Sequence, residues 1–275
     1  MTIFVILLVS VYKHENRIVH ELSSQCDSLW HICDSINQDI RQRFHNIPEQ
    51  DDYLKPYNSY FSSIYSVCLT RFDIIYSDGR KRQIVLSDNN IELPKSVGFL
   101  LNNGMFFTAR IIIEPWHYWP ENIREEYHSL INNGGHLVAS FSALSPSGCQ
   151  HEFTSDDFSY NTTCDNIYFD YAYTTVGNSF DGLDFDAEKS RNLEIDDFLF
   201  VLGSYIKKNK DTTLVKPIIF QCRVDNITKQ KTIISDLDAD QYYGCPVFYK
   251  ESSGKMKVIG LYLPEGIIPI YQILY

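Results

Sequence analysis

The feature that most constrains the fold of this chain is a succession of short β-rich runs separated by turn signals. Asn102-Asn103-Gly104 joins two such runs, and Asn-Gly is a strong signal for a tight hairpin. Ser77-Asp78-Gly79 separates two others. This pattern predicts an all-β sandwich or two-barrel architecture. The predicted strands are Ile64–Tyr76, Gln83–Leu86, Val97–Leu101, Met105–Ile113, His136–Phe141, Ile167–Tyr173, Phe198–Leu202, Pro217–Val224, Thr232–Ile234, Pro246–Tyr249 and Lys257–Leu263.

The N-terminal part of the chain has a different pattern. Between His14 and Phe44 the apolar residues recur at steps of three and four, which predicts an amphipathic helix that ends before Pro48. Such a helix either packs on the domain or serves as a partner-binding or pro-segment. The apolar run from Ile3 to Val9 is too short to span a bilayer, and it is either a secretory signal or a packed start of the chain. The predicted division is residues 1–12 as a possible signal, 13–63 as helix and linker, and 64–275 as the main domain.

Composition excludes some functions and favours a location. The net charge of −11 argues against non-specific binding to nucleic acid phosphates. The sequons at Asn161 and Asn226 favour a secreted glycoprotein. The chain has seven cysteines, and Cys149 and Cys164 are candidates for a loop-closing disulfide, although the connectivity does not follow from the sequence. No phosphate loop, dinucleotide fingerprint or metal-ligand spacing occurs, so no cofactor or metal is expected.

The stretch from Glu114 to Leu130 interrupts the strand pattern. It contains Trp116 and Trp119 beside charged residues and predicts a surface loop followed by a short helix. Tryptophans in this setting are either a binding patch or the anchors of a loop. Both interpretations stay open on the sequence.

Two short motifs resemble a known family. Tyr243-Gly244-Cys245-Pro246-Val247-Phe248 resembles the segment around the nucleophile of chymotrypsin-like serine proteases, Gly-Asp-Ser-Gly-Gly-Pro-Val, with Tyr243 in the place of the serine. Gly104 to Ile111 resembles the strand and turn of the family's Thr-Ala-Ala-His motif, with Ile111 in the place of the histidine. Shorter matches follow in the family's order, at Tyr65–Leu69, Gly98–Asn102, Phe169–Tyr173, Val201–Ser204 and Lys257–Leu261, and Ile267–Tyr275 takes the place of the family's terminal helix. The resemblance implies a double six-stranded β-barrel over residues 64–275.

The same resemblance implies that the chemistry is lost. A serine triad needs a nucleophile, a base that takes its proton and an acid that orients the base. Asp170 fits the position of the acid, but the isoleucine side chain of Ile111 has no atom that accepts a proton. The phenol ring of Tyr243 would occupy the space of the scissile carbonyl. The degenerate triad positions are therefore Ile111, Asp170 and Tyr243.

The loop before the nucleophile position also departs from the family. The oxyanion-loop positions are Gln241, Tyr242 and Gly244, and Gln241 replaces a glycine of the family. Tyr242 replaces the carboxylate that pairs with the new N-terminus after activation cleavage. Leu237 stands at the base of the primary specificity pocket and offers no counter-charge for a basic side chain.

These features predict an inactive homologue of the serine proteases, a pseudoprotease that binds a protein or peptide partner. One alternative is an active hydrolase in which Cys245 is a displaced nucleophile, assisted by one of the loop histidines. The other is an unrelated all-β binding domain whose resemblance to the proteases is fortuitous.

Overall fold

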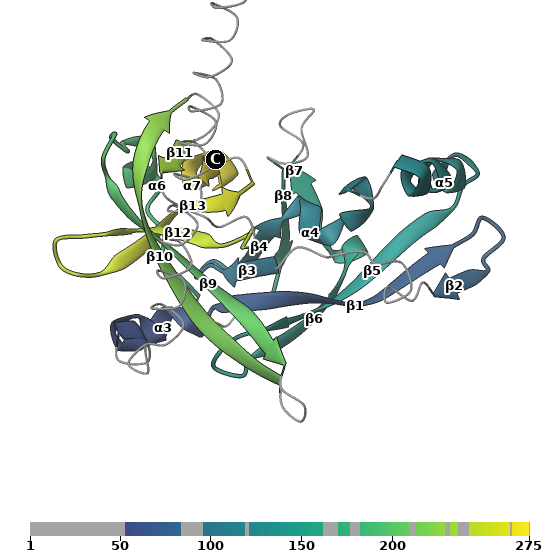
Figure 1. Cartoon of the computed structure of the whole chain (residues 1–275), viewed down its shortest axis with the longest axis horizontal. Helices are drawn as coiled ribbons and strands as arrows, with labels where there is room; N and C mark the ends of the chain where they lie inside the picture. The colour runs from purple at the N-terminus through teal and green to yellow at the C-terminus, as the bar shows by residue number, and fades with distance from the viewer. Residues whose placement is uncertain are drawn as a thin grey trace, which may run out of the picture. The chain divides into compact units, whose positions relative to one another are not determined.

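A computed structural model describes residues 53–83, 96–118, 121–161, 170–176, 182–208, 213–228, 232–235, 242–264 and 266–274. The described part is mostly β-strand and contains two sheets (Figure 1). The predicted all-β class is therefore confirmed. The helix predicted between His14 and Phe44 and the apolar run from Ile3 to Val9 lie outside the described residues. Most of the predicted linker is described, and there the prediction is wrong, because this segment forms two short helices and buries Leu54, Tyr57 and Phe61.

The first sheet has eight strands in the order β6-β5-β1-β3-β4-β8-β7, and β2 pairs with the far end of β1. All the pairings are antiparallel. The order leaves β6 and β7 as the two ends of an open sheet among the described strands. The first of the two expected barrels is thus not observed as a closed six-stranded barrel. The strands are β1 (Ile64–Ile75), β2 (Lys81–Gln83), β3 (Ser96–Leu100), β4 (Met105–Ala109), β5 (His136–Leu144), β6 (Gln150–Thr154), β7 (Ser159–Asn161) and β8 (Tyr171–Thr175).

The second sheet closes into a six-stranded barrel in the order β10-β11-β14-β13-β12-β9. Closure removes the exposed sheet edges that an open sheet leaves unpaired. Its longest pairing joins β9 and β10, from Phe198 opposite Arg223 to Lys208 opposite Thr213. The strands are β9 (Phe198–Lys208), β10 (Thr213–Ile227), β11 (Thr232–Ser235), β12 (Pro246–Lys250), β13 (Met256–Leu263) and β14 (Gly266–Pro269).

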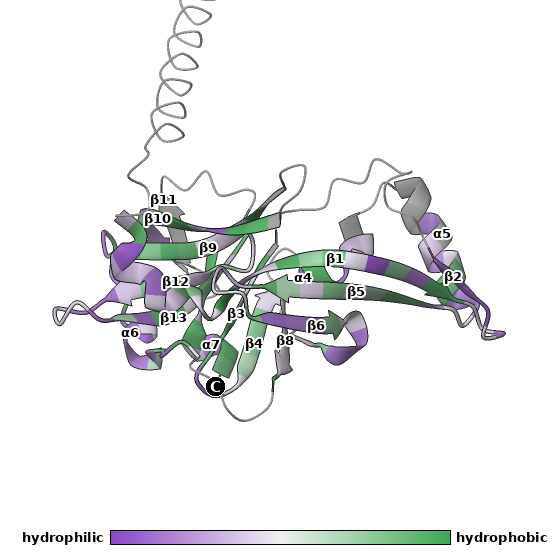
Figure 2. Ribbon diagram, turned by 90° about the horizontal axis from the view of Figure 1, so that it is seen from below, coloured by the Kyte–Doolittle hydropathy of each residue, from purple (hydrophilic) through white to green (hydrophobic). Residues whose placement is uncertain are grey.

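The turns follow the sequence signals closely. Gly104 has φ of +80° and ends the tight connection between β3 and β4, where its N–H donates to the carbonyl of Leu101. A positive φ strains any residue with a Cβ, so glycine is the residue that fits this turn. Gly79 has φ of +84° in the connection between β1 and β2. β2 lies at a hydrophilic end of the first sheet, where all three of its residues are exposed (Figure 2).

The helical segments are short. They are η1 (Lys55–Tyr57), α3 (Asn58–Phe61), α4 (Arg110–Ile113), η3 (Pro115–Tyr118), α5 (Glu121–Asn132), η4 (Ser155–Asp157), α6 (Ala187–Arg191) and α7 (Ile270–Leu274). The segments η3 and α5 match the loop and helix that the sequence predicts after Glu114. Among the described residues, none of the helices combines the length and the apolar character that a bilayer crossing requires.

Three details of the strand prediction are wrong. The strand predicted for Met105–Ile113 stops at Ala109, and the run of isoleucines that follows forms the single turn α4, in which all three are buried. Burial in a packed turn outweighs the weak β-preference of branched residues. The sequence does not predict the strands β6 and β7, because Gln150–Thr154 and Ser159–Asn161 are too polar to stand out. The expected terminal helix begins only at Ile270, after the strand β14.

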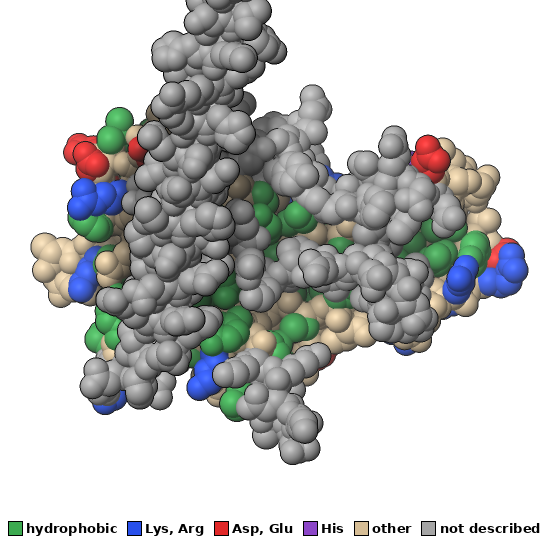
Figure 3. All heavy atoms as spheres, viewed as in Figure 1, with side chains coloured by type: hydrophobic (Ala, Val, Ile, Leu, Met, Phe, Trp, Pro, Cys, Tyr) green, Lys and Arg blue, Asp and Glu red, His purple; other side chains and the backbone are tan. Residues whose placement is uncertain are grey.

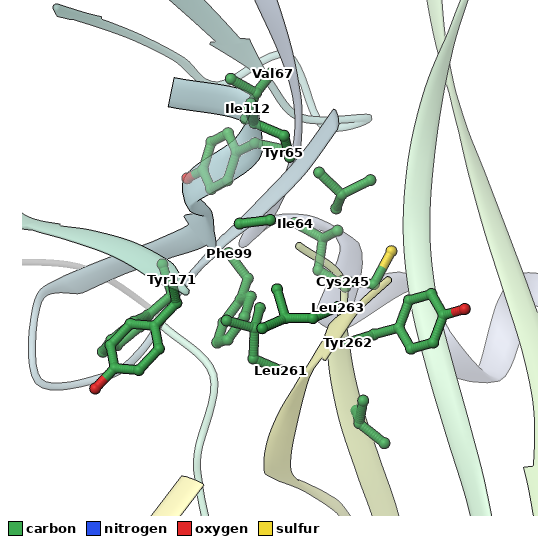
Figure 4. Packing of buried hydrophobic residues seen from close by; sticks show 14 of the residues in the cluster. Ile64, Tyr65, Val67, Phe99, Ile112, Tyr171, Cys245, Leu261, Tyr262 and Leu263 are labelled. Atoms are coloured by element: carbon green, nitrogen blue, oxygen red, sulfur yellow. The ribbon is translucent and has the colours of Figure 1, made fainter. Parts of the chain in front are cut away.

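The two sheets pack on each other through one continuous apolar core. Ile64 and Phe99 of the first sheet gather with Leu261 and Leu263 of the barrel, and all four are fully buried (Figure 4). A buried hydrogen bond of 2.9 Å between the hydroxyls of Ser66 and Ser204 links β1 to β9 within this interface. The junction of the two sheets is therefore apolar and tightly packed.

Candidate functional site

The position of the expected base lies where β4 ends and α4 begins. The backbone leaves the extended conformation at Ala109, and Ile111 sits in the following turn with 6% of its side chain exposed. The side chain of Ile111 is purely aliphatic. It contributes to the core rather than to a polar site.

Asp170 lies directly before β8 and is 2% exposed. Its backbone carbonyl accepts a hydrogen bond of 3.0 Å from the N–H of Arg110, and its Oδ2 accepts one of 2.8 Å from Nη1 of the same arginine. Arg110 thus holds Asp170 through both the main chain and the side chain. The carboxylate expected to orient a histidine is instead paired with a guanidinium.

Arg110 lies at the centre of a polar group. Its Nε donates to Glu114, one turn further along, and its guanidinium lies 5.0 Å from the centre of the Tyr160 ring. Desolvation lowers the pKa of Arg110, but the bonds to Glu114 and Asp170 outweigh it and raise this pKa above its ordinary value. The guanidinium is therefore a permanent cation, and it has no lone pair with which to accept a proton.

The sequence motifs did not single out Arg110. Arg110 stands where the family motif has an alanine, directly before the histidine position, and the motif assigns no catalytic role to that alanine. The available signal was Asp170 itself, because an aspartate on a strand that becomes buried needs a compensating cation. The sequence did not reveal which basic residue supplies that partner.

The turn that carries Tyr243 lies against the end of β4. The carbonyl of Tyr243 accepts a hydrogen bond of 2.9 Å from the N–H of Val97, and its ring lies 6.3 Å from that of Tyr262. Gly244 follows with φ of +89°, and a Cβ built on it would lie 1.9 Å from the carbonyl oxygen of Val97 and 3.1 Å from the N of Ala109. The turn therefore packs directly against the residue two positions before Ile111.

These contacts bring the three positions that the sequence aligns with the protease triad onto neighbouring segments. Asp170 is bonded to Arg110, Ile111 follows Arg110, and the Tyr243 turn contacts Ala109. Arg110 and Asp170 are 60 residues apart in the chain, yet they meet where β4 ends. The side chains on these neighbouring segments are an arginine–aspartate pair, an isoleucine and a tyrosine.

The remaining predicted positions are scattered or not described. Tyr242 is half-buried, and its ring lies 5.3 Å from that of Phe220 in the barrel. Gln241 and Leu237 lie outside the described residues. Of the two sequons, Asn161 is the last residue of β7, and Asn226 is an exposed residue of β10.

Cys245 is fully buried beside Gly203. Burial raises the pKa of its thiol well above the ordinary value. A Cβ on Gly203 would lie 2.8 Å from its Sγ, so the sulfur fills a gap that only glycine leaves open. In this conformation Cys245 is a small core side chain rather than a thiolate.

The cysteines correct one expectation. Four cysteines are thiols in the structure, namely Cys68, Cys149, Cys222 and Cys245. Because Cys149 is a thiol, the candidate disulfide between Cys149 and Cys164 is not formed. Cys164, Cys26 and Cys33 lie outside the described residues. Within the ranges that are described, no group of three or more histidine, cysteine or acidic side chains is placed to hold a metal ion.

Comparison with known proteins gives structural similarities alone. No protein-family model and no curated protein sequence matches the chain. The secreted serine protease VesC from Vibrio cholerae matches 77% of the chain at 10% identity and a TM-score of 0.45, and the match spans 44% of that protein. The protease of tobacco vein mottling virus matches 80% of the chain and 83% of its own length, at 11% identity and a TM-score of 0.38.

Proposed function

We propose that this chain is a catalytically inactive relative of the chymotrypsin-like serine proteases that binds a protein or peptide partner. The observation that carries the proposal is the pairing of Arg110 with Asp170 beside Ile111. This pairing engages the acid of the expected triad with a residue that cannot act as a base.

The chemistry of the three positions supports the proposal. Peptide hydrolysis by a serine-type mechanism needs a group that accepts the proton of the nucleophile. Ile111 has no such group, and Arg110 stays protonated. Neither Ile111 nor Arg110 can therefore accept a proton from the phenol of Tyr243. Recognition without turnover is the function that remains for such a site.

The alternative of a displaced nucleophile finds little support. Cys245 would have to become exposed and lose its proton before it could attack a carbonyl. Its complete burial and its raised pKa both oppose this. The hairpin would have to leave the core, where Gly203 and the barrel strands hold the sulfur.

An unrelated all-β binding domain is the second candidate. The observation in its favour is the first sheet, which is open with eight strands among the described residues rather than a closed barrel of six. The meeting of the Ile111, Asp170 and Tyr243 segments argues for protease ancestry instead. Both candidates share the expectation that the protein binds without turnover.

The test is a search for hydrolysis with the full-length protein. A mixture of unlabelled peptides is incubated with it and read by mass spectrometry, and a fluorophosphonate probe and a peptidyl chloromethyl ketone report on reactive serine and cysteine side chains. We expect no cleavage and no covalent labelling, with trypsin as the positive control in the same buffer. Specific cleavage that co-purifies with the folded protein would contradict the proposal.

Matched variants then locate any activity that is found. Cys245→Ala tests the displaced nucleophile, and Cys222→Ala is its control, because both thiols are buried in the barrel. Cleavage lost in the first variant and kept in the second would establish Cys245 as the nucleophile. Cleavage unchanged in both would assign the activity to other residues.

A further inference from the structure

A cavity of about 200 Å³ lies next to the Arg110 cluster. It opens between η3, α5, the start of β5, η4 and β7. Glu114, which binds Arg110, is one of its walls. The residues that line the cavity are Glu114, Trp116, Tyr127, Ile131, His136, Leu137, Ser155, Asp156, Phe158 and Tyr160.

Aromatic rings form much of the wall. The ring centres of Trp116 and Tyr127 lie 5.9 Å apart. The ring of Trp116 also packs against that of Phe72, with 5.8 Å between their centres. Tyr160 is fixed by a hydrogen bond of 2.9 Å from its hydroxyl to the carbonyl of Ser155. The rings are thus held in place before any ligand arrives. Aromatic faces attract cations through the negative charge on their π-systems, most strongly when water is excluded.

Carboxylates give the cavity a negative potential. Glu114 is mostly buried in the wall, whereas Asp156 stands at the mouth with 54% of its side chain exposed, and its Oδ1 lies 3.0 Å from Nε2 of His136, another residue of the wall. Arg110 balances one of the two buried carboxylates, Glu114 and Asp170, so acidic charge is in excess near the cavity. The phenols respond to this charge. Burial and then Glu114 raise the pKa of Tyr127, and the same two causes raise the pKa of Tyr160.

The face seen in Figure 3 carries both basic and acidic side chains, so charge there is mixed. The cavity differs from that surface, because acidic and aromatic side chains line one hollow. Its volume lies below the roughly 300–1,000 Å³ of sites for drug-sized ligands. The space suits a single extended side chain.

We propose that this cavity binds the lysine or arginine side chain of a peptide partner. The aliphatic part of such a side chain would lie along Ile131 and Leu137, and its charged end would lie among the aromatic rings near Glu114. The inference rests on the proposed function, since it names the ligand class of a binding module. It concerns a site beside the degenerate triad rather than the triad itself.

The test measures the binding of short peptides to the full chain by isothermal titration calorimetry. The probes are acetyl-Gly-Lys-Gly-amide, acetyl-Gly-Arg-Gly-amide and the neutral acetyl-Gly-norleucine-Gly-amide. We expect the two basic peptides to bind at least about fivefold more tightly than the norleucine peptide, because norleucine keeps the hydrocarbon chain and lacks the charge. Equal binding of all three, or no binding at a ligand concentration of millimolar order, would overturn the proposal.

Two pairs of variants place the binding in the cavity. Ile131→Lys puts a competing ammonium at the rim, and Asn132→Lys adds the same charge one residue away on an exposed position that does not line the cavity. Asp156→Asn removes a carboxylate from the mouth, and Glu152→Gln removes one from an exposed position outside it. We expect Ile131→Lys and Asp156→Asn to weaken the basic peptides about two- to fivefold and the two controls to leave affinity within error.

Parallel losses in a variant and its control would show that the peptides respond to the overall charge of the protein, and the cavity would be excluded. The outcome is also separable from that of the proposed function. Hydrolysis of the probes, seen by mass spectrometry after the titration, contradicts the inactive-relative proposal. Intact probes that fail to bind contradict the cavity proposal alone.

Discussion

Nη1 of Arg110 donates a hydrogen bond of 2.8 Å to Oδ2 of Asp170, and the backbone N–H of Arg110 donates a second to the carbonyl of Asp170. This double attachment joins the turn after β4 to the start of β8. The pair of Arg110 and Asp170 therefore has a structural role that does not depend on whether the protein is an enzyme. Its buried environment makes that role measurable.

Removal of Arg110 is expected to destabilise the protein strongly. Arg110→Leu leaves the carboxylate of Asp170 buried at 2% exposure without its cation, which typically costs about 3–5 kcal/mol. Chemical denaturation gives the free energy of unfolding. Arg71→Leu is the control, because Arg71 pairs with Asp73 at a side chain that is 53% exposed, and such surface pairs contribute about 0–1 kcal/mol.

The single variant Asp170→Asn and the double variant Arg110→Leu with Asp170→Asn complete a double-mutant cycle. We expect the double variant to be more stable than Arg110→Leu alone, because the buried charge has been removed as well. A double variant that loses the sum of the two single effects would show that the two residues act independently. That result would contradict the interpretation of the pair as a coupled unit.

Gly244 is expected to tolerate no side chain. In Gly244→Ala the methyl group would meet the carbonyl oxygen of Val97 at 1.9 Å, and the backbone would keep a φ of +89°. Gly254→Ala is a matched control, with φ of +86° and open space around the new methyl group. We expect the control to cost about 1–2 kcal/mol from backbone strain alone and Gly244→Ala to cost considerably more. Similar thermal melting temperatures for the two variants would count against the close packing of this turn.

Thiol reactivity should separate the cysteines by burial. Brief treatment of the native protein with iodoacetamide, followed by peptide mass spectrometry, should alkylate the exposed Cys149 and leave Cys245 unmodified. The raised pKa of Cys245 and its complete burial both suppress the thiolate that reacts. Labelling in denaturant should then modify both to completion. Rapid native labelling of Cys245 would instead support the displaced-nucleophile alternative.

His151 is expected to make the protein less stable in mild acid. Its ring lies 5.3 Å from that of Tyr65, and burial lowers its pKa below the ordinary 6.5. The unfolded chain therefore binds a proton at His151 at a higher pH than the folded chain does. The contribution to the free energy of unfolding is complete above about pH 6.5 and declines as the pH falls from there toward the lowered pKa of the folded state.

His151→Phe keeps a ring beside Tyr65 and removes this titration. We expect the loss of stability between about pH 7.5 and pH 5.5 to be smaller in the variant than in the wild type. Urea denaturation at several pH values provides the measurement. A larger loss of stability in the variant than in the wild type would contradict the lowered pKa of His151 and the burial of its neutral imidazole.

The positions of the turns and most strands follow from the sequence, because they depend on neighbouring residues. Asn102-Asn103-Gly104 and Ser77-Asp78-Gly79 both mark turns whose glycine has a positive φ. The strands that the sequence does not predict, β6 and β7, are polar segments that pair with a neighbouring strand at the ends of the first sheet. Each pairs with the strand next to it in the chain, β6 with β5 and β7 with β8, but their polar residues lack the alternating apolar pattern by which the sequence predicts a strand.

The sequence by itself determined the β-rich class, the main turns and the chemical identity of the side chains at Ile111, Asp170 and Tyr243. These properties need only residue types and local spacing. Only the tertiary structure decided that Arg110 is the partner of Asp170, that Cys245 is buried beside Gly203, and that aromatic rings and carboxylates from separate segments line one cavity. Each of these depends on contacts between segments that lie apart in the chain, and local residue patterns do not specify such contacts.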